Sequence, residues 1–181
     1  KFVTSVGLIT SRGEYGDDIM ASEWTHHLSY SPGLIAVCIG NKRIKATSKN
    51  IDKSKEFGIN IAAIDQNVMT SIAGNNTGLE IDKIKVLKSL GFKFFEAKKI
   101  KALMVEEAAM QIECKLVRKI KIGDHTMDLS GYGNIAYGFF VGYYYKLFQV
   151  LAHPYADLRQ RDNLETQAAI RAKCNNNSIC Y

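Results

Sequence analysis

The chain has 181 residues, of which 46% are hydrophobic and 23% charged, the size and composition of one folded domain and not of a disordered chain. Its formal net charge of +6 suits an anionic partner, but the lysines alternate with acidic residues, as in NIDKSKEFG, which argues against nucleic acid. The sequence has no apolar run of the roughly 20 residues that span a bilayer, and its start lacks a secretory pattern. We therefore expect a soluble, cytoplasmic protein that binds neither nucleic acid nor a membrane.

Short strands dominate the first two thirds of the sequence. The segments VTSVGLIT (3–10), LIAVCIG (34–40) and FGINIAA (57–63) are apolar or β-branched and are bounded by turn residues. In MQIECKLVRKIKI (110–122) apolar and polar residues alternate, and only Val117 and Arg118 break the period of two. This pattern predicts a long antiparallel strand with one buried face.

Two short helices are predicted between the strands. TSKNIDKSKE (47–56) offers Thr47 or Ser48 as the N-cap of a helix that ends before Phe57. A second helix in LEIDKIKVLKSLGF stops at Gly91 and has apolar positions three apart, namely Ile81, Ile84, Leu87 and Leu90. Regular βαβ alternation is missing, and so are the GxGxxG and GxxxxGK[ST] motifs, so we predict a mainly β, antiparallel barrel or sandwich.

The cysteines and histidines give no metal-binding pattern. Paired-Cys zinc spacing is lacking among the four cysteines, Cys38, Cys114, Cys174 and Cys180. The first two lie in strand-like segments and are expected to be buried, whereas a disulfide between the last two stays open. His26 and His27 are adjacent and would point to opposite faces of a strand, so we expect no metal there.

The sequence changes character after Gly138. Seven of the nine tyrosines lie from Tyr132 onward, and residues 155–173 are typical of a helix rich in Gln, Arg and Ala. We interpret the aromatic cluster as a packing or dimer surface in preference to a ligand site. The predicted division is a domain over residues 1–150 and a C-terminal helical tail over residues 151–181.

The segment from Met20 to Ile51 can serve a flat ligand that carries a phosphate. Such a ligand needs an apolar wall, backbone polar groups and a cluster of cationic and hydroxyl donors. Small residues and an aromatic wall come first, and charges and hydroxyls follow at the start of a helix, where free N–H groups favour an anion. The residues are Ala21, Ser22, Trp24, Arg43, Lys45, Thr47 and Ser48. The alternative is that the cations are solvent-facing turn residues and Thr47 is only a cap.

Five segments, in this order, resemble the flavin reductase-like family of FMN-binding split barrels over about residues 3–135. They are VGLITSRGEYGDDIMASEWTHHLSYSPGLIAVCIG, RIKATSKNIDKSKEFGINI, GNNTGLEIDKI, ALMVEEAAMQIECKL and GDHTMDLSG. The basic loop is longer than the family's usual arrangement, which leaves open whether Arg43 or Lys45 is the phosphate cation. Beyond Tyr137 the resemblance ends.

The resemblance implies an antiparallel Greek-key split barrel that binds FMN as a homodimer. By position, the isoalloxazine would meet Ala21, Ser22, Glu23 and Trp24, with polar contacts from Ser29 and Ser31. The phosphate would be held by Arg43, Lys45, Thr47 and Ser48, and the loop that closes over the flavin would contain Asn76 and Thr77. His125 would contact the nicotinamide or the flavin; the alternative is a strand-end histidine bonded to backbone.

Two functions follow as hypotheses. In the first, electrons pass from NADH or NADPH through FMN to an acceptor, which is free flavin, ferric iron or a redox partner protein. In the second, the protein is a non-catalytic flavin-binding or electron-carrier protein.

Overall fold

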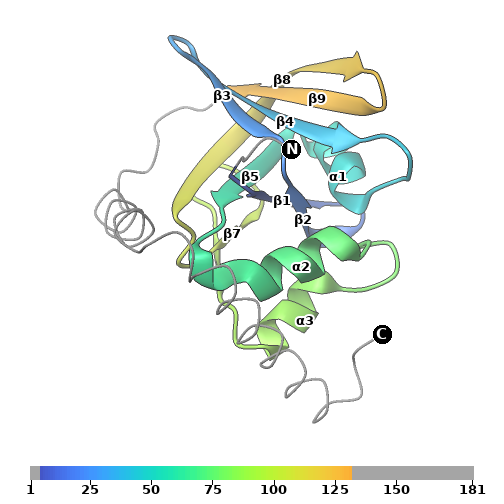
Figure 1. Ribbon diagram of the computed structural model, residues 1–181, viewed down its shortest axis with the longest axis vertical. Coiled ribbons are helices and arrows are strands. Elements are labelled where there is room, and N and C mark those ends of the chain that lie inside the picture. The colour runs from blue at the N-terminus through green and yellow to red at the C-terminus, as the bar shows by residue number, and fades with distance from the viewer. Residues whose placement is uncertain (1–4, 132–181) are drawn as a thin grey trace, which may run out of the picture. The chain divides into compact units, whose positions relative to one another are not determined.

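Seven antiparallel strands form one curved sheet in the computed structural model, which describes residues 5–131 (Figure 1). Their order is β2-β1-β5-β8-β9-β4-β3. The strands are β1 Gly7–Gly13, β2 Gly16–Ser22, β3 Thr25–Tyr30, β4 Gly33–Gly40, β5 Glu56–Ile61, β8 Met110–Ile122 and β9 His125–Gly131. Hairpins join β1 to β2, β3 to β4 and β8 to β9, while the pairings β1–β5, β5–β8 and β4–β9 are long-range. The predicted mainly β, antiparallel Greek-key split barrel is confirmed.

The long strand has the predicted bounds, Met110–Ile122, and the predicted irregularity. Its pairing with β9 shifts register between Leu116 and Arg118, which is a β-bulge, and Val117 there is 64% exposed. The prediction of one buried face holds for the first half, where Ile112 and Cys114 are buried. It is wrong near the hairpin tip, where Ile122 is 50% exposed because the strand extends past the core.

Short helices and a two-stranded sheet fill the connections. The helices are α1 Ala46–Ser54, the 3-10 turn η1 Ile64–Gln66, α2 Asn67–Asn75 and α3 Lys83–Ser89. The small sheet pairs β6 Phe94–Glu96 with β7 Leu103–Val105. Asp82 caps α3 by accepting from the Lys85 N–H, and Gly91, at a φ of +90°, follows its end as predicted. None of the described helices is long and apolar enough to cross a membrane.

The predicted cap of α1 is wrong. The N-cap is Lys45, which makes no side-chain cap bond, and neither Thr47 nor Ser48 takes this place. Thr47 lies in the first turn, where its hydroxyl donates to Asp18 of β2. A cap residue is favoured for its bond to a free helix N–H, but here the bond to a neighbouring strand uses that hydroxyl.

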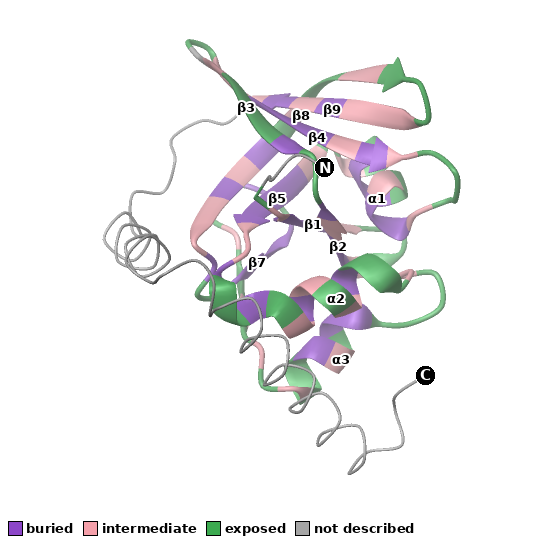
Figure 2. Cartoon of the chain, in the orientation of Figure 1, coloured by how far each residue is buried: buried purple, intermediate pink, exposed green. Residues whose placement is uncertain are grey.

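β1 separates two hydrophobic cores, because its successive side chains point to opposite faces. Ile9 packs in the barrel core with Val37, Phe57 and Ile59. Leu8 packs in a second core, which α2, α3 and β7 complete. Figure 2 shows buried residues along the central strands and along one side of α2 and α3. The sheet is therefore covered on both faces near β1.

The two described cysteines differ in burial. Cys114 lies in the barrel core, and burial raises the pKa of its thiol to about 12. Cys38 is only half-buried, so its predicted burial is wrong: alternation along β4 turns Val37 and Ile39 to the core and Cys38 to the other face. The remaining cysteines, the tyrosine cluster and the predicted domain boundary all lie outside the described residues.

Asp128 is a carboxylate buried in β9 without a hydrogen bond. Within residues 5–131 neither of its oxygens has a hydrogen-bond partner, and Lys119 Nζ lies 3.5 Å from Oδ1. Lys119 is also paired with Asp52 of α1. Burial raises the pKa of Asp128 to about 6, and the Lys119 charge opposes this shift.

Asp128→Asn should therefore make the protein more stable at neutral pH. The native state binds the Asp128 proton more tightly than the unfolded state does. Protonation of Asp128 therefore stabilises the fold fully below about pH 4, and this stabilisation is lost as pH rises through about 6. We expect the variant's advantage in urea unfolding to grow by about 1–3 kcal/mol between pH 4 and pH 7. Wild-type and variant curves that stay parallel over this range would contradict the assignment.

Candidate functional site

A pocket of about 250 Å³ opens where the β4–α1 loop meets the tip of the β8–β9 hairpin. It is lined by Gly40, Lys42, Arg43, Lys45, Asp124 and His125. Three residues that the sequence singles out, Arg43, Lys45 and His125, therefore lie around one cavity although they are far apart in the chain.

Hydrogen bonds hold the two loops together. The Asn41 N–H donates to the Asp124 carbonyl at 2.8 Å, and the Thr126 hydroxyl donates to Asn41 Oδ1 at 2.8 Å. Gly40 of β4 is paired with His125 of β9. The His125 ring lies close to Gly40, since a Cβ added to this glycine would lie 3.5 Å from His125 Nε2. The pocket walls are thus fixed by β4–β9 pairing and its extension into the loops.

His125 is held between an aromatic ring and a carboxylate. Its ring lies against Trp24, with centroids 4.4 Å apart and planes at 35°. Nδ1 lies 2.6 Å from Asp124 Oδ1, and this contact lowers the pKa of Asp124. A proton on Nδ1 donates to Asp124, which leaves Nε2 as the ring nitrogen for a ligand. The alternative expectation, a strand-end histidine bonded to backbone, does not hold, because the His125 side chain contacts a carboxylate and an aromatic ring.

The N-terminus of α1 adds backbone donors to the cationic pocket. No acidic residue lies in its first turn, and the N-cap residue Lys45 itself lines the pocket beside Lys42 and Arg43. The free N–H groups of a helix N-terminus and its partial positive charge favour an anion. Cations and helix end act together here, so the arrangement suits a phosphate.

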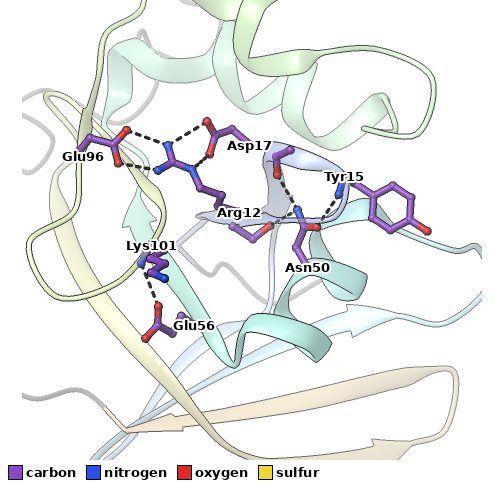
Figure 3. Close-up of polar contacts among 9 residues, drawn as sticks. Arg12, Tyr15, Asp17, Asn50, Glu56, Glu96 and Lys101 are labelled. Carbon is purple, nitrogen blue, oxygen red and sulfur yellow. Dashed lines mark hydrogen bonds and ion pairs between the residues drawn. The ribbon is translucent and has the colours of Figure 1, made fainter.

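Thr47 and Asn50, three residues apart on α1, attach this helix to the β1–β2 hairpin. The Thr47 hydroxyl lies 2.5 Å from Asp18 Oδ2, and Asn50 Nδ2 donates to the Gly16 carbonyl at 3.0 Å. Figure 3 shows Asn50 beside Tyr15, whose N–H donates to Asn50 Oδ1. The Thr47 hydroxyl is therefore already bonded within the protein. Ser48 is half-buried.

The end of β2 has the character expected of a wall beside a flat ring. Ala21 is half-buried, and a Cβ on Gly74 of α2 would lie 3.4 Å from the Ala21 Cβ. Ser22 is buried, and its hydroxyl donates to the Cys38 carbonyl at 3.2 Å. Glu23 is exposed, and Trp24 is 45% exposed beside His125.

Of the predicted residues, Arg43, Lys45 and His125 line the pocket and the others do not, including those of the β2 end and Thr47 and Ser48. Ser29 is near the far end of β3, and Ser31 precedes Pro32 through a cis peptide bond in the β3–β4 turn. Asn76 and Thr77 lie in the loop between α2 and α3. This loop is linked to α1 through Lys83 and Asp18.

The sequence analysis gave no role in the site to Lys42 and Asp124, which line the pocket, nor to the buried pair Asp18 and Lys83. The side chains of this pair are 3% and 2% exposed, and Lys83 Nζ lies 3.1 Å from Asp18 Oδ1. Burial lowers the pKa of Lys83, against the pull of Asp18. An acidic residue inside a strand and a lysine at a buried helix position are the signals that could have identified this pair.

Comparison with known proteins places this chain in a family. The model of the flavin reductase like domain matches residues 1–129, so the chain belongs to the flavin reductase-like domain family. An uncharacterized protein of Archaeoglobus fulgidus is 28% identical over 67% of this chain, and one of Pyrococcus abyssi is 32% identical over 62%. The matches span 66% and 63% of those relatives' own lengths.

Solved structures agree on the fold. A flavoredoxin of Desulfovibrio vulgaris is similar at 25% identity, with a TM-score of 0.64 over 75% of this chain and 69% of that one. An FMN-binding protein of Thermus thermophilus matches at 20% identity and a TM-score of 0.65, over 74% and 70% of the two chains. An NADH:FAD oxidoreductase of Streptomyces globisporus matches at 19% identity and a TM-score of 0.65, over 74% of this chain and 75% of that one.

Proposed function

We propose that this protein binds FMN, with the phosphate at the N-terminus of α1 and the ring between the end of β2 and Trp24. The observation that carries the proposal is the pocket that joins Lys42, Arg43 and Lys45 to His125, itself in contact with Trp24. The donor set fits a phosphate ester, because charge-assisted bonds from cations and helix N–H groups recognise this group. The family and the flavin-related names of its structural neighbours support the same ligand.

The chain's own residues would bind and orient. Bound flavin supplies redox chemistry that no side chain has, since it can accept a hydride from reduced nicotinamide. Backbone groups of Ala21 and Ser22 would meet the ring, because the Ser22 hydroxyl is already bonded to Cys38. His125, oriented by Asp124, presents Nε2 to a ring oxygen or to the carboxamide of nicotinamide. It is a hydrogen-bonding residue in this proposal, since hydride transfer needs no protein acid.

Electron transfer from NADH or NADPH to a small-molecule or protein acceptor is the activity that we infer, with the protein acting as a homodimer in the cytoplasm. The predicted contacts from Ser29, Ser31, Asn76 and Thr77 belong to this proposal. Within residues 5–131 these four lie outside the pocket lining, so they would act from a partner subunit or after loop closure. A flavin carrier without turnover is the alternative function.

The first test is the absorption spectrum of the purified protein at 300–550 nm, before and after addition of FMN, FAD or riboflavin. We expect a bound-flavin spectrum and the tightest binding for FMN. Tighter binding of FAD would show that FAD, and not FMN, is the cofactor. No binding of any flavin would refute the proposal. With flavin bound, oxidation of NADH or NADPH in the presence of acceptors separates a reductase from a carrier.

A further inference from the structure

Asp18 stands at the meeting point of three segments. It accepts from the Thr47 hydroxyl in the first turn of α1 and pairs with Lys83 at the start of α3. Lys83 Nζ also donates to the Asn76 carbonyl at 3.3 Å. A Cβ on Gly78 would come within 2.4 Å of Asp18 Oδ1, so the loop passes directly over the carboxylate. One buried ion pair thus connects β2, the first turn of α1 and the loop that contains Asn76.

Neither member of this pair lines the pocket. Their side chains are 3% and 2% exposed. Desolvating two charges is expensive, and apolar residues of similar size often serve stability as well or better. The pair contacts α1, where we place the phosphate, and the loop between α2 and α3. These contacts suggest a role for the pair beyond packing.

We propose that Asp18 and Lys83 are positioning residues for the flavin phosphate. The carboxylate fixes Thr47 and thereby sets the first turn of α1, whose backbone N–H groups face the anion. Lys83 fixes the Asn76–Gly78 loop to the same carboxylate. This inference rests on the proposed function, and it adds that phosphate recognition depends on a buried contact behind the helix.

The second attachment of α1 makes the role testable. Asn50 holds the helix to the β1–β2 hairpin through the Tyr15 N–H (Figure 3) and the Gly16 carbonyl, without using Asp18. Loss of the Asp18 contacts should therefore free the first turn while the helix stays in place. Affinity for FMN should fall, whereas affinity for riboflavin, which has the same ring and no phosphate, should stay.

The experiment measures dissociation constants for FMN and riboflavin by flavin fluorescence. Thr47→Val removes the hydroxyl at nearly constant volume, and Asp18→Asn/Lys83→Met removes both charges together. For each we expect the preference for FMN over riboflavin to fall at least about tenfold, with riboflavin affinity within threefold of wild type. Thr47→Val keeps the ion pair, so it tests the contact even where the double variant fails to fold.

The matched control is Asp17→Asn. Asp17 is the next residue on β2 but faces the other way, where Arg12 bridges it to Glu96 (Figure 3). This control should keep the wild-type preference for FMN. Folded Thr47→Val or double variants that keep the preference, or that lose both affinities together, would overturn the positioning role while FMN binding stands. A wild-type protein that binds both flavins equally, or neither, would remove the phosphate site and this inference with it.

Discussion

Lys83→Met should lower the free energy of unfolding by about 3–5 kcal/mol, because it leaves the buried Asp18 carboxylate without its cation. The methionine replaces most of the lysine's volume, so lost packing makes a small contribution to this effect. Urea unfolding at pH 7 measures it.

The control for this prediction is the double variant Asp18→Asn/Lys83→Met, which removes both charges. We expect it to be clearly more stable than Lys83→Met alone, since no buried charge is left unpaired. A Lys83→Met variant within about 1 kcal/mol of wild type would show that water reaches the carboxylate and that the pair is not truly desolvated.

Arg43→Ala/Lys45→Ala should weaken FMN binding by about 3–6 kcal/mol, from two charge-assisted bonds of roughly 1.5–3 kcal/mol each. Both side chains line the pocket and neither is buried, so the fold should tolerate the change. Thr47 is left intact because its hydroxyl belongs to the Asp18 contact. The measurement is FMN titration by fluorescence.

The matched control is Lys49→Ala/Lys53→Ala, which removes the same charge from exposed positions of α1 outside the pocket lining. It should bind FMN nearly as wild type does. If the two double variants lose equal affinity, general electrostatic attraction and not local phosphate contact explains the effect. The two single variants then tell whether Arg43 or Lys45 is the principal cation.

The strands were predictable because their signals are local. Alternation along 110–122 predicted β8 with correct bounds, and the break at Val117 coincides with the bulge. The site is different, since the pocket joins the β4–α1 loop to a hairpin tip much later in the chain. The resemblance placed Arg43, Lys45 and His125 in one site, but spacing could not show that Asp124 orients the histidine.

Local rules failed where a tertiary contact competes with them. Thr47 has the chemistry of an N-cap, yet Asp18 on another strand takes its hydroxyl. α2 was not predicted, because NVMTSIAGN is short; its docking on β2 and η1 stabilises it. Asp18 and Lys83 were missed for a related reason, since neither charge has a partner nearby in sequence.

The strand order has a consequence for how the protein is made. β4 pairs with β9 and β5 with β8, so a ribosome must release nearly the whole described region before these ladders can close. The cavity beside α1 therefore exists only in the finished fold. A flavin that binds there binds the native state alone, and at 100 times its dissociation constant it adds about 2.7 kcal/mol to stability. Supply of the cofactor and the lifetime of the folded protein would then be thermodynamically linked.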